Sequence, residues 1–100
     1  GAATAERALR FMIEKHAESK LLPLHVMALG DFYADLARGY ATAHDRALAF
    51  SEDDFTRLTD RALDVYRKVA TWDGAKEKPE GQARFATLDA FKTATITRYR

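Results

Sequence analysis

Hydrophobic residues recur every three or four positions through most of the chain, as they do on one face of a helix. In residues 5–20 this pattern includes His16, and Thr4 precedes it as a candidate N-cap. Pro23 disfavours helix at the residue before it and suits the first turn of a new helix. We therefore predict one helix over residues 5–20 and a second that begins at Pro23.

The second predicted helix, residues 23–50, carries one apolar stripe along its whole length. The stripe consists of Val26, Leu29, Phe32, Tyr33, Leu36, Tyr40, Ala43, Ala47 and Phe50. Gly30 and Gly39 interrupt the helix, and each weakens it by about 1 kcal/mol relative to alanine. Either glycine can therefore mark a bend or a close contact with a neighbouring helix.

End signals bound a third predicted helix, residues 52–72. Ser51 suits an N-cap, and the acidic residues that follow it favour the positive end of the helix dipole. Gly74 suits a left-handed stop after the other end. The apolar stripe between these signals consists of Phe55, Leu58, Ala62, Val65, Tyr66, Val69 and Trp72.

A fourth helix is predicted over residues 79–99, with Pro79 at its first position. Its stripe consists of Phe85, Leu88, Phe91, Thr95, Ile96 and Tyr99. Residues 93–97 alternate and are rich in β-branched side chains, a pattern that is also typical of a strand. Because no second strand is predicted to pair with them, helix is favoured there too.

The four segments predict an all-α fold, a single domain over residues 1–100 built as a four-helix up-down-up-down antiparallel bundle. Short connections place consecutive helices side by side and antiparallel. Each end of such a bundle gathers residues from several helices. One end is expected to hold His16, His25 and Trp72, and the opposite end Ala5, His44, Phe55 and Tyr99.

Composition narrows the range of partners. With 16 basic and 15 acidic residues the net charge is +1, so the broad positive field that attracts nucleic acid is absent and no nucleic-acid partner is expected. The chain has no cysteine, which excludes disulfides and thiolate metal sites. No apolar run approaches the roughly 20 residues of a transmembrane helix. The expected partner is a protein, either a different one or a second copy.

Charge is distributed unevenly between the last two predicted helices. Acidic residues concentrate on residues 52–72 and basic residues on residues 79–100, so the two helices should attract each other modestly. Lys92 sits within the apolar stripe of the fourth helix, near Asp89, and is expected to extend its amino group to water.

The N-terminal sequence Gly1-Ala2-Ala3-Thr4 lacks a methionine and is typical of a tag remnant before a trimmed N-terminus. Removal of a signal peptide would give such an N-terminus, so a periplasmic or secreted location is favoured over a cytoplasmic one. A domain cut out of a longer protein would look the same, and both interpretations stay open.

No catalytic motif occurs in the chain: there is no nucleophile elbow, zinc-protease helix, P-loop or dinucleotide fingerprint. We therefore expect no enzymatic activity. Met12 and His16 lie one turn apart, and small cysteine-free four-helix bundles can hold haem between a methionine and a histidine. The fourth predicted helix offers no histidine or methionine as the opposing ligand, so no cofactor is expected.

His16 and His25 both fall on apolar stripes and are predicted to meet across the first turn between helices, near Trp72 and Asp73. The simplest interpretation is that each ring packs in the core and that one of its nitrogens forms a hydrogen bond with a nearby group. The alternative is a binding site for a small ligand or metal ion, or a proton switch.

Phe11 breaks the pattern of the first helix. At about 100° per residue it points about 160° away from the mean direction of Leu9, Ile13 and His16, and it shares its face with charged residues. A lone exposed apolar residue is common. The alternative is that Phe11 is a binding residue in an interface.

Two functional hypotheses follow. The first is a non-enzymatic helical module that binds another protein or self-associates. The second is an exported bundle that senses or carries a small ligand or metal at the His16/His25 end.

Overall fold

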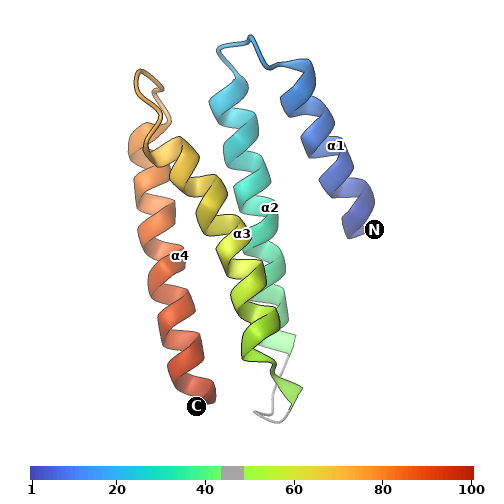
Figure 1. The fold of residues 1–100 in the computed structure, drawn as a ribbon, viewed down its shortest axis with the longest axis vertical. Coiled ribbons are helices and arrows are strands. Elements are labelled where there is room, and N and C mark those ends of the chain that lie inside the picture. The colour runs from blue at the N-terminus through green and yellow to red at the C-terminus, as the bar shows by residue number, and fades with distance from the viewer. Residues whose placement is uncertain (44–48) are drawn as a thin grey trace.

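The computed structural model describes residues 1–43 and 49–100, and these ranges contain four helices. The helices are α1 (Ala2–Lys15), α2 (Leu22–Ala43), α3 (Glu52–Ala70) and α4 (Lys78–Tyr99). They run alternately up and down, as Figure 1 shows. The prediction of an all-α, antiparallel four-helix bundle is confirmed.

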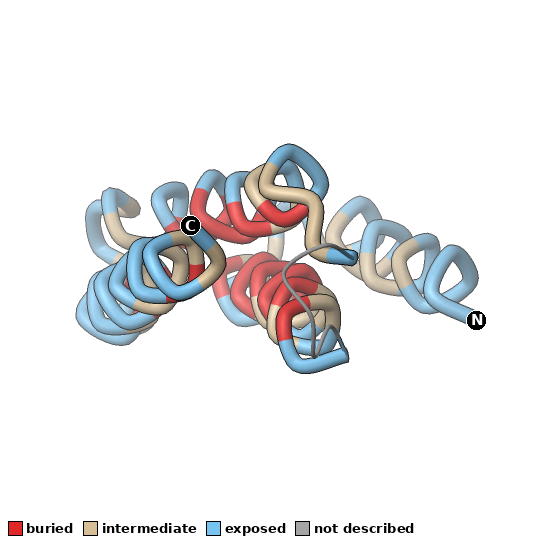
Figure 2. The backbone as a smooth tube through the Cα atoms, turned by 90° about the horizontal axis from the view of Figure 1, so that it is seen from below, coloured by how far each residue is buried: buried red, intermediate tan, exposed pale blue. Residues whose placement is uncertain are grey.

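The hydrophobic core lies between α2, α3 and α4, whereas α1 lies on the outer side of α2 (Figure 1). No residue of α1 is buried, and Figure 2 shows the buried positions on the other three helices. With 14 residues against 22, α1 is about two-thirds as long as α2 and begins beside its middle. The expectation that Ala5 lies at the same end as Phe55 and Tyr99 is therefore wrong.

The first helix differs from its prediction at both ends. It is capped by Gly1 and begins at Ala2, so Thr4 lies inside the helix instead of capping it. It ends at Lys15, and residues 16–20 form turns and a bend instead of a last helical turn. These residues are needed to reverse the chain before α2 begins at Leu22.

The second helix ends at Ala43, not at residue 50. Phe50 lies outside any helix, and the extended Ser51 after it is the N-cap of α3. A helix that continued to residue 50 would leave no residues to turn the chain before that cap. Residues 44–48, and with them His44, lie outside the described residues.

The end signals at Ser51 and Pro79 hold, whereas Gly74 does not cap α3, whose C-cap is Thr71. The Ser51 side chain accepts a hydrogen bond from the backbone N–H of Asp54, at 3.2 Å. Gly74 has a φ of +82°, in the left-handed region, although α3 itself already ends at Ala70. Pro79 lies in the first turn of α4, and the strand-like residues 93–97 are helical.

An aromatic cluster closes the end of the bundle where α3 begins. The ring of Phe50 stacks on Tyr99 with centroids 4.1 Å apart and lies 5.3 Å from Phe55. Phe55 in turn meets Phe91 edge-on at 6.0 Å. The prediction that Phe55 and Tyr99 share one end is confirmed, and Phe50 joins them from outside the helix.

The helices α2 and α3 approach each other closely at Gly30. A Cβ atom on Gly30 would lie 2.7 Å from two ring carbons of Tyr66. Tyr66 is held in place, because its hydroxyl donates a 2.6 Å hydrogen bond to Asp31. Asp31 also pairs with Arg84 of α4, so this link joins three helices. Burial and the bond to Asp31 raise the pKa of Tyr66 well above the ordinary tyrosine value.

We expect alanine to have opposite effects at the two glycines of α2. Gly30→Ala should lower the free energy of unfolding by about 1–2 kcal/mol, since the overpacking at Tyr66 outweighs the gain in helix propensity. Gly39 has open space around it, and Gly39→Ala should raise that free energy by about 0.5–1 kcal/mol. Urea denaturation of both variants checks this. Stabilisation by Gly30→Ala would contradict the close packing described here.

Candidate functional site

The helix α1 is the candidate functional element, because it carries Phe11 and leads directly to His16. Its inner side packs on the core through Leu9 and Ile13, both only partly buried. Among the helix pairs in close contact, α1 takes part in only one, with α2. Its opposite side is therefore free for contact with another molecule.

A buried tyrosine of α2 anchors α1. The hydroxyl of Tyr33 donates a 2.6 Å hydrogen bond to Glu6 Oε2 and accepts one of 2.7 Å from Arg10 Nη2. Burial, together with the bond to Glu6, raises the pKa of Tyr33. The hydrophobic pattern of the sequence did not reveal this anchor. Its only signals were a tyrosine on an apolar stripe, whose hydroxyl needs a partner, and the spacing of Glu6 and Arg10 by one helical turn.

The raised pKa of Tyr33 gives its contribution to stability a definite pH dependence. The neutral hydroxyl is favoured in the folded state, so the contribution is complete below the ordinary tyrosine pKa of about 10 and is lost as pH rises through the higher folded value. At high pH a tyrosinate would face the carboxylate of Glu6.

We expect wild type to lose more stability between about pH 9 and about pH 11 than Tyr33→Phe does, since the variant has no hydroxyl to ionise at this position. At neutral pH the variant should be less stable by about 0.5–1.5 kcal/mol through loss of the hydrogen bonds. Urea denaturation of both proteins across this range measures the difference. Parallel losses in the two proteins would show that Tyr33 is not responsible.

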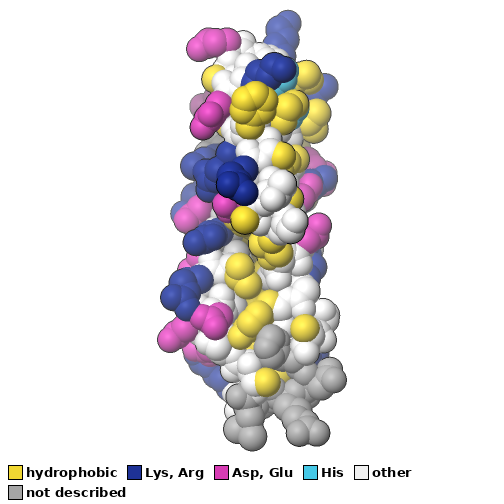
Figure 3. All heavy atoms as spheres, turned by 90° about the vertical axis from the view of Figure 1, so that its right-hand side faces the viewer, with side chains coloured by type: hydrophobic (Ala, Val, Ile, Leu, Met, Phe, Trp, Pro, Cys, Tyr) yellow, Lys and Arg dark blue, Asp and Glu magenta, His cyan; other side chains and the backbone are white. Residues whose placement is uncertain are grey.

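Phe11 lies on the side of α1 that faces away from α2. The residue is 59% exposed, which confirms that it does not join the core. We define the outer face of α1 as four exposed residues spaced by three or four positions, namely Thr4, Ala8, Phe11 and Lys15. Figure 3 looks onto this side of the molecule and shows an interrupted run of hydrophobic side chains with charged side chains beside it.

The structure brings His16 and His25 together as predicted. Their rings stack with centroids 4.9 Å apart and planes 30° from parallel. Nε2 of His25 is shielded from solvent and has no hydrogen-bond partner in the part of the chain that the structure describes. The interpretation that each histidine satisfies a nitrogen locally therefore does not account for this atom.

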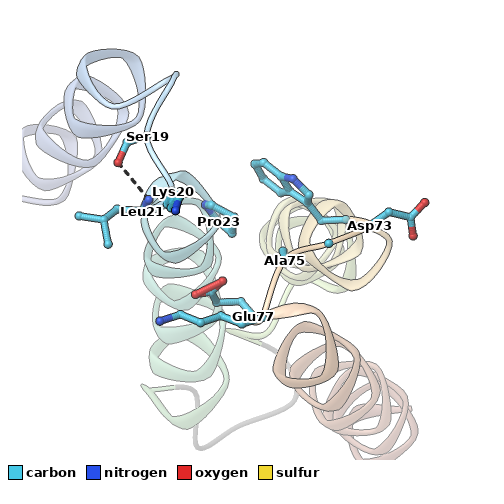
Figure 4. A pocket seen from close by; sticks show the side chains of 10 residues that line it. Ser19, Lys20, Leu21, Pro23, Asp73, Ala75 and Glu77 are labelled. Atoms are coloured by element: carbon cyan, nitrogen blue, oxygen red, sulfur yellow. Dashed lines mark hydrogen bonds between the residues drawn. The ribbon is translucent and has the colours of Figure 1, made fainter.

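Trp72 and Asp73, expected near the histidines, line a separate hollow of about 510 Å³ at the same end of the bundle. Figure 4 shows this hollow between Pro23 at the start of α2 and the turn that contains Asp73 and Ala75. Neither histidine lines it. Asp73 is exposed, and its bond to Lys78 lowers the pKa of the carboxyl.

Metal-binding groups are sparse around the histidines. His25 borders a hollow of about 390 Å³ whose other lining residues include Glu77 and Glu80. Within residues 1–43 and 49–100, no group of three or more histidine, aspartate or glutamate side chains is placed to hold a metal ion. A metal ion bound by both imidazoles would therefore need water or a ligand from elsewhere.

The predicted attraction between α3 and α4 is present as two ion pairs. Lys92 of α4 binds Asp60 of α3 at 2.8 Å. Arg100 binds Glu52, also at 2.8 Å, and lowers the pKa of that carboxyl.

Comparisons with known proteins give no further guide to function. No family model matches the chain, and neither the curated proteins nor the solved structures contain a match. No helix in the described ranges is long and apolar enough to cross a membrane.

Proposed function

We propose that this chain is a non-enzymatic helical module that works by contact between α1 and another protein chain. The observation that supports this is the 59% exposure of Phe11 on a helix that has no buried residue of its own. The sequence carries none of the catalytic motifs considered above.

The outer face of α1 suits contact with protein. Burying a phenylalanine side chain contributes about 1.5–3 kcal/mol, so covering Phe11 supplies a useful part of a binding energy. Ala8 beside it is small, which allows another helix to come close. Arg7 and Glu14 are exposed next to Phe11 and form the polar rim that protein interfaces have around their apolar centre.

A photo-crosslinking experiment tests whether this face is used. We expect p-benzoylphenylalanine in place of Phe11 to form covalent protein adducts of defined mass in cells of the source organism. The same residue in place of Leu24 is the control, because Leu24 is 51% exposed but lies on α2. If position 11 gives no more adduct than position 24, the proposed function is wrong.

A second candidate function is the binding of a small ligand or metal at the His16/His25 end. It is favoured by the unpartnered Nε2 of His25 within a stacked histidine pair. The hollow of about 390 Å³ that His25 borders falls in the range of ligand pockets, and Leu24, Met27 and Ala28 give it apolar walls.

This second candidate predicts that wild type binds about one equivalent of Zn²⁺ or Ni²⁺, because imidazole nitrogens are good ligands for both ions. The double variant His16→Ala, His25→Ala should lose that binding while keeping its helical circular dichroism spectrum. Isothermal titration calorimetry measures the stoichiometry. Equal, weak binding by both proteins would exclude a metal at this pair.

A further inference from the structure

We infer that the protein chain that covers the outer face of α1 is a second copy of this chain, with the two α1 helices antiparallel across a twofold axis beside Phe11. This inference rests on the proposed function and names its partner. The charges around Phe11 are arranged so that this surface complements a second copy of itself.

The two charged neighbours of Phe11 on one side have opposite sign. Arg7 precedes Phe11 by four residues and Glu14 follows it by three, so both lie next to Phe11 on the same side of the helix. Both are exposed, and neither makes an ion pair within the described part of the chain. Positive charge therefore lies one turn before the ring and negative charge one turn after it.

A patch of this kind is its own complement. A twofold interface brings the same surface of each copy together, so it needs opposite charges at positions that the axis exchanges. When two helices pack antiparallel, each side of one helix meets the same side of the other. Arg7 of each copy then lies opposite Glu14 of the second copy, and the two Phe11 rings meet between these pairs.

The parallel arrangement forms as many ion pairs, so the helix dipoles decide between the two arrangements. When the two helices are parallel, the side of one α1 that carries Arg7 and Glu14 faces the side of the other that carries Ala8 and Lys15. Glu14 would then lie beside Lys15 of the second copy, and Arg7 beside Ala8. Arg7 would then have no counter-charge, just as Lys15 has none opposite Ala8 in the antiparallel arrangement. Antiparallel packing opposes the two helix dipoles, which is the favourable alignment.

The size of the face sets the strength of the contact. α1 has 14 residues, and at about 1.5 Å per residue it is about 21 Å long. Two such helices in contact bury less surface than the roughly 800 Å² per partner of a standard interface. The dimer should therefore be weak and depend on protein concentration.

Charge reversal tests the antiparallel arrangement. We expect Arg7→Glu and Glu14→Arg each to raise the dimer dissociation constant by about fivefold or more, because two attractive contacts become repulsive. The double variant Arg7→Glu, Glu14→Arg should return to within about twofold of wild type, since the pairs re-form with their signs exchanged. Analytical ultracentrifugation over a wide concentration range at low salt measures all four proteins.

Two controls separate folding and net charge from the contact itself. Lys68→Glu makes the same change in net charge as Arg7→Glu, but at an exposed position of α3. It should leave the dissociation constant of the dimer unchanged. Phe11→Ser should abolish dimerisation and leave the thermal unfolding transition of the monomer in place, because Phe11 makes no core contact.

The outcomes distinguish this inference from the proposed function. A wild type that stays monomeric, while position 11 still crosslinks to other proteins in cells, would overturn the second copy as partner and leave the module intact. A dimer that Arg7→Glu does not weaken, or that the double variant does not restore, would overturn the antiparallel arrangement. Absence of any crosslink at position 11 would overturn the proposed function as well.

Discussion

The close contact of α2 and α3 at Gly30 is the constraint on which the rest of the structure depends. The ring of Tyr66 occupies the space that any larger residue would need at Gly30. With its ring against the glycine, the Tyr66 hydroxyl reaches Asp31, and Asp31 can also bind Arg84. One missing side chain on α2 therefore fixes the spacing of two helices and the polar link to the third.

The helix α1 lies outside this three-helix arrangement and contributes least to the core. Every buried residue of the described chain lies outside α1, which packs only the partly buried Leu9 and Ile13 against the core. What holds α1 is a half-buried apolar contact and one buried hydroxyl, that of Tyr33, bound to Glu6 and Arg10. A helix held in this way can bind a partner on its outer side without any change in the core, because no core residue reaches that side.

Helical periodicity was sufficient to predict the number, order and direction of the helices, and also the exposure of Phe11, because these depend on local geometry. Helical periodicity predicted the end of α2 wrongly, because Phe50 fits the apolar spacing of this helix although it lies outside it. It could not say which glycine of α2 is a contact point, since that depends on Tyr66, far along the chain. The Tyr33 anchor was missed for the same reason: its partner Glu6 lies 27 residues away.

The hydrogen bonding of the histidine pair could not be predicted from the sequence either. That His16 and His25 meet follows from the short turn between their helices. Whether a ring nitrogen finds a partner depends on which atoms of other residues surround it, and Nε2 of His25 finds none in the described chain.

Association and the docking of α1 on α2 are linked thermodynamically. A second copy that binds only docked α1 stabilises the docked state by its binding free energy. The fraction of molecules with α1 docked on α2 therefore rises with protein concentration. Conversely, when α1 is undocked, part of the binding free energy is used to dock it, and the measured affinity between the two copies is weaker. In the proposed dimer the Tyr33 anchor would contribute to binding without touching the partner, because it holds Phe11, Arg7 and Glu14 in place on one ordered helix.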